Sequence, residues 1–215
     1  MILNNLEAAL SYASRGWPVL PMHSINEDGI CSCGSPGDYW LGSPTKHAMG
    51  KHPYTERGHK DATKEHSQIY LWWQIWPEAN VAIRTGLQSG LVVLDIDAKN
   101  KGFSSLSQIE KIKGPLPKTP TVRSGGGGIH LYFKHPGFEL RGRREMRPGI
   151  DVMADGGKIV APPSRHKSGN RYLWEEGLSP EVVSLAPLPR WLLTMIQTKN
   201  EPRKRFRTLV ANLWG

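Results

Sequence analysis

Residues 91–97 (LVVLDID) constrain this chain more than any other segment, because a short apolar run leads directly into two acids. A run of Leu, Val and Ile of this length predicts a buried strand. Side chains alternate along a strand with a period of two, so Asp95 and Asp97 are expected to lie on the same face. Two carboxylates this close repel each other unless a cation lies between them, and such a pair is a frequent ligand set for Mg²⁺ or Mn²⁺. The alternative is a strand end that only meets solvent.

Hydrophobic periodicity elsewhere predicts few helices and many short strands. Helices are predicted at 3–14, 67–76, 103–113 and 188–196, and Pro77 ends the second of them. Strands are predicted at 17–22, 79–84 and 91–96, followed by short segments at 121–123, 130–133, 149–153, 158–161 and 171–174 that Gly and Pro separate. This pattern predicts an α+β fold with a largely antiparallel sheet.

A run of four glycines precedes one of these strands, in the segment 124–130 (SGGGGIH). Backbone without Cβ atoms can approach a phosphate closely and present N–H groups to it, and His130 is placed to donate a hydrogen bond to the same phosphates. The loop is not a Walker loop, because it lacks GK[ST]. The alternative is a flexible hairpin turn followed by a histidine that is merely packed.

A third carboxylate lies in the segment 149–164 (GIDVMADGGKIVAPPS). Ile150 and Val152 are expected to be buried on one face of a strand, which directs Asp151 to the other face. A buried carboxylate needs a cation or a hydrogen-bond donor. Asp155 precedes two glycines and is predicted to be a turn residue outside the site.

Residues 26–61 form a loop without periodicity, longer than compact domains usually leave unsupported. Its cysteines and histidines form a C-x-C and H-x4-H set that suits tetrahedral Zn²⁺, namely Cys31, Cys33, His47 and His52. The spacing is unlike that of the common zinc fingers, and His59 or His66 can replace one of the histidines. The alternative is two incidental thiols in an intracellular chain.

The charge balance points toward a polyanionic partner, because the chain carries a formal net charge of +9 at pH 7. Basic residues lie near the motifs (Lys51, Arg84, Arg123 and Lys158) and in a dense run between His130 and Asp151 (Arg141, Arg143, Arg144 and Arg147). A charge run is usually a solvated face, but its position beside a metal-site candidate favours nucleic acid. No apolar stretch is long enough for a membrane span and no signal peptide is recognised, so a cytoplasmic location is expected.

Seven segments taken in order resemble the bifunctional primase/polymerase domain, a branch of the archaeo-eukaryotic primase superfamily. They are GWPVLP, C-x-C with GKHP, HKDAT with WW, PEANVAIRTG, LVVLDID, SGGGGIHLYF, and PGIDV followed by GGKIVAPPS. The resemblance implies a palm-like α+β core related to the RNA-recognition fold, with a mostly antiparallel or mixed sheet flanked by helices and a zinc-binding loop insertion at about 26–61. It implies a catalytic domain over residues 1–197 and a basic tail or linker over 198–215, toward a C-terminal region such as a helicase domain.

The resemblance also implies roles for individual residues. Asp95 and Asp97 match the first catalytic motif, Ser124 and His130 the second, and Asp151 the third. The three acids would hold two Mg²⁺ or Mn²⁺ ions, and the triphosphate would be held by Ser124, Gly125, Gly126, Gly127, Gly128, His130, Arg123, Lys158 and Ser164. Cys31, Cys33 and His52 resemble the zinc-binding insertion of the family, and His47 stands where a third cysteine is often found.

The implied activity is template-directed synthesis and extension of primers from NTPs or dNTPs on single-stranded DNA, in the replication of a phage, plasmid or other mobile element. Two other classes remain: a nucleic-acid-binding module on the same fold with a degenerate metal site, and a metal-dependent nuclease. The intact set of carboxylates argues against the binding module. A nicking nuclease would need a nucleophilic tyrosine near a histidine pair, and Tyr132 beside His130 does not supply that pair.

Overall fold

The computed structural model describes residues 3–34 and 48–198. Predicted zinc ligand His47 and the predicted basic tail from residue 199 onward lie outside the described residues. The elements in chain order are α1 (Asn5–Ser14), β1 (Val19–Met22), the 3-10 helix η1 (Gly58–Asp61), α2 (His66–Ile75), β2 (Asn80–Arg84), β3 (Leu91–Ile96), α3 (Gly102–Lys113), β4 (Thr121–Arg123), β5 (Ile129–Lys134), β6 (Arg143–Arg147), β7 (Ile150–Met153), β8 (Lys158–Ala161), β9 (Leu173–Trp174), β10 (Ala186–Pro187) and α4 (Arg190–Gln197).

The strands form two sheets, so the α+β prediction is confirmed, with a second sheet that the sequence did not reveal. The small sheet has the order β1-β2-β8, and the large sheet has the order β6-β7-β3-β5-β4-β9, with β10 added to β5. Every pairing is antiparallel except β10 with β5. Strand β3 therefore lies inside the large sheet, between β5 and β7.

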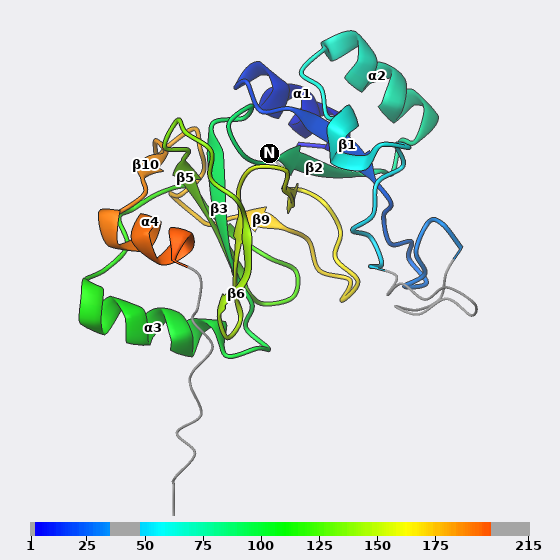
Figure 1. The fold of residues 1–215 in the computed structure, drawn as a ribbon. Coiled ribbons are helices and arrows are strands. Elements are labelled where there is room, and N and C mark those ends of the chain that lie inside the picture. The colour runs from blue at the N-terminus through cyan, green and yellow to red at the C-terminus, as the bar shows by residue number, and fades with distance from the viewer. Residues whose placement is uncertain (1–2, 35–47, 199–215) are drawn as a thin grey trace, which may run out of the picture.

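Strand β3 is buried on both faces, which explains its uninterrupted apolar run. Leu91 and Val93 belong to a core shared with α1, α2 and the small sheet. Val92 and Leu94 belong to a second core shared with α3 and α4. Figure 1 shows the same separation, with α1 and α2 beside β1 and β2, and with α3 and α4 at the other end of the molecule. Asp95 continues the face of Leu91 and Val93, toward the first of these cores.

All four helices differ from their predicted bounds by one or two residues, and the starts of α1 and α4 differ for local reasons. Helix α1 begins at Asn5 because Asn4 is its N-cap, and the Asn4 and Glu7 side chains each accept a hydrogen bond from the other residue's backbone N–H. Helix α4 begins at Arg190 because Ala186–Pro187 pairs with β5 as β10 and Pro189 is the N-cap. No helix among the described residues is long and apolar enough to cross a membrane.

Candidate active site

Three motifs that are far apart in the sequence meet in one row across the large sheet. Asp95 on β3 pairs with His130 on β5 at one side and with Asp151 on β7 at the other. Directly paired residues of antiparallel strands project their side chains to the same face, with Cβ atoms about 4.5–5.5 Å apart. The register therefore gathers the predicted residues Asp95, Asp151 and His130, one from each motif.

Asp97 lies just beyond β3, where the chain turns toward α3. Its backbone N–H donates to the carbonyl of Gly149 at 2.8 Å, which joins it to the turn before β7. Its carboxylate accepts hydrogen bonds from the N–H of Lys99 at 2.8 Å and from Nδ2 of Asn100 at 2.5 Å. The two acids of the DxD motif thus line one cavity but have different surroundings.

The carboxyl group of Asp95 is in an unfavourable place for a charge. Burial raises its pKa from 3.8 to about 6, Lys51 opposes that shift, and the charges of Asp151 and Asp97 add to it. The side chain is 31% exposed, so it still reaches solvent. A divalent cation at this point would remove both the repulsion and the desolvation cost. The acid cluster therefore has the electrostatics expected of a cation site.

His130 is a neutral histidine. Burial lowers its pKa to about 3, and the charges of Lys51 and His166 act in the same direction. Its Nε2 lies 3.6 Å from Oδ1 of Asp95, beyond hydrogen-bond distance, and its buried Nδ1 has no hydrogen-bond partner among the described residues. A neutral imidazole carries one N–H donor and one acceptor, so His130 can donate to a ligand oxygen without adding a charge.

A cavity of about 730 Å³ opens in front of these acids. Its lining combines the acids with four cationic side chains, from Lys51, Lys99, Arg144 and Lys167. Carboxylates and cationic side chains in one cavity suit a divalent metal ion bound together with a polyphosphate. The volume lies within the range of about 300–1,000 Å³ that is usual for small-molecule sites.

The glycine run forms a tight turn at one wall of this cavity. The N–H of Ser124 donates to the carbonyl of Gly128, and the N–H of Gly127 donates to the carbonyl of Ser124. The N–H of Gly128 donates to the Ser124 hydroxyl at 3.0 Å. The expectation of N–H groups open along the whole run is therefore wrong for Gly127 and Gly128. Gly126 lines the cavity, and its N–H has no acceptor within the described part of the chain.

Close packing explains two of the four glycines. A Cβ at Gly128 would overlap the carbonyl oxygen of Ile96 on β3, and a Cβ at Gly125 would overlap the Cβ of His166. The run is thus needed for the approach of the turn to β3 and to His166, in addition to any contact with a ligand.

Ser164 and Arg123, predicted to hold the triphosphate, point elsewhere. Ser164 is fully buried, and its hydroxyl accepts from the N–H of Val81 at 2.8 Å and donates to the Val81 carbonyl, so it joins the chain after β8 to β2. Arg123 follows Val122, the partner of His130, and strand alternation turns it to the opposite face, where it lies 3.7 Å from Glu175.

Lys158, the other basic residue predicted to hold the triphosphate, is half-buried on β8 in the small sheet and is not among the residues that line the cavity. Burial lowers its pKa, and the charge of Arg144 lowers it further. Residues that the sequence did not assign to the site, including Asn100, His166, Lys167 and Tyr172, do line it. In the sequence, the one feature that could have identified them is that each lies shortly after one of the motifs.

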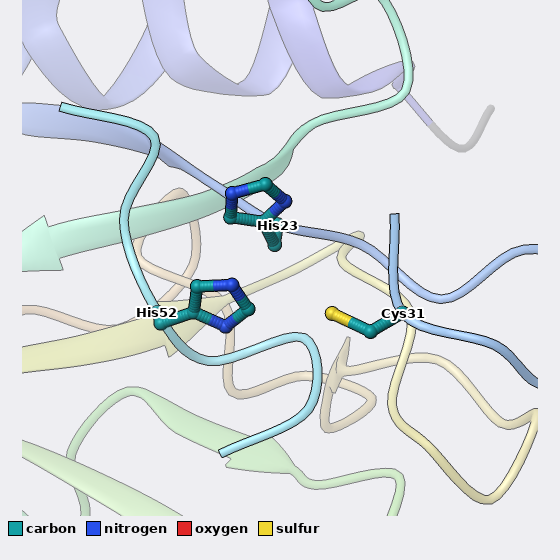
Figure 2. A group of neighbouring side chains, drawn as sticks. All are labelled: His23, Cys31 and His52. Carbon is teal, nitrogen blue, oxygen red and sulfur yellow. The ribbon is translucent and has the colours of Figure 1, made fainter. Parts of the chain in front are cut away.

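A second group of ligand-type side chains lies in the N-terminal part of the chain. His23, Cys31 and His52 bring their ligand atoms within 4.8 Å of one another, and Figure 2 shows the three side chains close together, with the Cys31 sulfur directed toward the His52 ring. Nδ1 of His52 donates to the carbonyl of Ala48 at 3.1 Å, which leaves Nε2 as the ligand atom. One thiolate and two imidazoles are ligands that fit Zn²⁺.

This group differs from the predicted zinc set. His23 takes part although it lies before the cysteines, whereas Cys33 lies outside the group of three. His23 follows β1, and its N–H donates to the carbonyl of His52. Its ring stacks on His52 with centroids 4.1 Å apart. The spacing of the cysteines therefore could not predict that His23 and His52 lie side by side.

One comparison with known proteins identifies a family. A search of curated proteins finds no match. The family model described as bifunctional DNA primase/polymerase, N-terminal, matches residues 9–191, and so includes every acid of the site and all three members of the histidine and cysteine group. The chain belongs to the bifunctional DNA primase/polymerase N-terminal family.

Proposed function

We propose that this domain is a template-directed nucleotidyltransferase that synthesises primers and extends them from NTPs or dNTPs on single-stranded DNA. The observation that carries the proposal is the row of His130, Asp95 and Asp151 across three strands, in a cavity that cationic side chains also line. Family membership supports the same class of enzyme. The net charge of +9 fits a nucleic-acid partner.

In this proposal Asp95, Asp97 and Asp151 hold Mg²⁺ or Mn²⁺. The bound ions would lower the pKa of the attacking 3′-hydroxyl and stabilise charge on the leaving pyrophosphate. Neutral His130 donates its N–H to a phosphate oxygen, and the N–H of Gly126 donates to another. Lys51, which lines the cavity, supplies positive charge to the triphosphate.

We further propose that the group of His23, Cys31 and His52 binds a structural zinc ion. The ion would join the end of β1 to the two sides of the insertion, 31–34 and 48–54. Lys51 directly precedes His52 and lines the acidic cavity. Zinc would therefore fix the segment that carries Lys51 to the site.

The biological setting is proposed from the resemblance alone. Replication of a phage, plasmid or other mobile element fits a primase/polymerase domain. A helicase domain in the same protein, following the basic tail, would be its partner.

The test is a primer-extension assay with a single-stranded DNA template, labelled dNTPs or NTPs, and Mn²⁺ or Mg²⁺, with and without an annealed primer. The expected result is product from the wild type and none from the Asp95→Ala/Asp97→Ala double variant. Asp28→Ala is the matched control, because Asp28 is an exposed acid that does not line the cavity.

Each outcome selects a class of function. Product without a primer identifies a primase, and product only with a primer identifies a polymerase whose initiation needs another part of the protein. Bound DNA without product in any combination supports the binding module and overturns the proposal. Cleavage of DNA that depends on Asp95 would support the nuclease.

A further inference from the structure

Strand β6 contains an irregularity directly opposite Asp151. Arg143 pairs with Val152 and Arg147 pairs with Ile150, so the three residues between them on β6 stand opposite Asp151 alone. Glu145, in the middle of this bulge, has φ of +48°, a left-handed conformation that costs energy in a residue with a Cβ. Strain of this kind persists only where the surrounding structure holds it in place.

The bulge brings two different donors to the Asp151 carboxylate. The backbone N–H of Glu145 donates to Oδ1 at 2.7 Å, and Nη1 of Arg144 donates to Oδ2 at 3.3 Å. The backbone donor cannot leave without unfolding the bulge. The guanidinium lies at the end of a flexible side chain that is 84% exposed, and an exposed ion pair is weak. One oxygen is thus held permanently, and the other is held by a displaceable cation.

We propose that Arg144 is an exchangeable counter-ion, which pairs with Oδ2 of Asp151 until a divalent cation takes that oxygen and then binds a phosphate of the incoming nucleoside triphosphate. The inference rests on the proposed function, since it uses Asp151 as a metal ligand. Repulsion between like charges disfavours simultaneous occupation of Oδ2 by both cations. Arg144 lines the same cavity as Ser124, Gly126 and His130, the residues proposed to hold the phosphates. Its guanidinium and the proposed phosphate site therefore share one cavity.

The exchange predicts opposite effects on two affinities. Without Arg144 the metal ion has no competitor, so metal binding should become tighter. The triphosphate loses a charge-assisted contact, so its binding should become weaker. An arginine that only stabilised the pairing of β6 with β7 would lower both affinities when removed.

The experiment measures Mn²⁺ affinity of the whole chain by the paramagnetic resonance signal of free Mn²⁺, and then dATP affinity by calorimetry at saturating Mn²⁺. For Arg144→Gln we expect Mn²⁺ binding about two- to fivefold tighter and dATP binding at least about tenfold weaker. Arg144→Lys keeps the charge but loses the planar fork, so it should leave Mn²⁺ binding near the wild-type value and still weaken dATP binding. This variant also answers the question if the glutamine variant does not fold.

The matched control is Arg141→Gln. Arg141 is an exposed arginine three residues before Arg144, its Nε lies 3.0 Å from Glu139, and it does not line the acidic cavity. It should change neither affinity. Unchanged or weaker Mn²⁺ binding in Arg144→Gln would overturn the exchange alone. If the wild type binds no Mn²⁺, or if Asp151→Asn binds Mn²⁺ as the wild type does, the proposed function is overturned as well.

Discussion

Replacing Asp95 by asparagine should stabilise the protein when no divalent ion is present, although it removes a proposed catalytic group. Asparagine has nearly the same shape as aspartate and no charge. The pKa of Asp95 is raised from 3.8 to about 6, mainly by burial, so the folded state disfavours its charged form. A shift of this size corresponds to at most about 3 kcal/mol at 1.36 kcal/mol per pKa unit. Because the side chain is 31% exposed, solvent screening reduces the expected gain to about 1–2 kcal/mol.

The pH dependence follows from the direction of this shift. Between about pH 4 and pH 6 the folded wild type binds more protons at Asp95 than the unfolded chain, so its stability falls as the pH rises through this window. Asparagine does not titrate. The advantage of Asp95→Asn should therefore be greatest above about pH 6 and should disappear toward about pH 4.

The measurement is urea denaturation of both proteins at about pH 5 and about pH 8, in buffer free of Mg²⁺ and Mn²⁺. Asp155→Asn is a control with the opposite sign. Although burial opposes it, hydrogen bonds from the N–H groups of Leu140 and Leu87, together with His135, lower the pKa of Asp155. Its replacement should cost about 1–3 kcal/mol at neutral pH. If Asp95→Asn is no more stable than the wild type at about pH 8, or if its advantage does not shrink on acidification, the account of Asp95 as a charge in an unfavourable place is wrong.

Three further variants test the glycine turn, the correction at Ser164 and the metal group. Gly128→Ala should destabilise the protein by about 1–3 kcal/mol because its Cβ overlaps backbone, whereas a Cβ at Gly126 meets side-chain atoms alone, the nearest being Cε1 of His166 at 3.3 Å; thermal unfolding compares Gly128→Ala with Gly126→Ala, and equal losses would contradict the packing account. Ser164→Ala should cost about 1–3 kcal/mol by leaving the N–H of Val81 without its hydroxyl acceptor, yet should leave dATP affinity unchanged; a large loss of affinity would return Ser164 to the nucleotide site. His23→Ala should lower zinc content from about one ion per chain, measured by elemental analysis, whereas Ser164→Ala should retain it; full zinc content in the histidine variant would remove His23 from the ligand set.

Local patterns determined several features of this protein without tertiary structure. The apolar run of β3 and its acidic end follow from residue types and from alternation along one strand, which depend on near neighbours only. The same holds for Asp151 between Ile150 and Val152, because alternation along its strand buries these two neighbours. In each case the interaction that decides the structure lies within a few residues of the motif.

Only the tertiary structure decided which motifs meet. The register of β3 with β5 and β7 places Asp95 between His130 and Asp151, and the pairing of the segment after β1 with the insertion places His23 beside Cys31. Arg123 was expected at the phosphates from its place in the sequence, but its strand turns it to the opposite face. Register and sheet packing arise from contacts between segments tens of residues apart, and a residue's neighbours along the chain carry no record of those contacts.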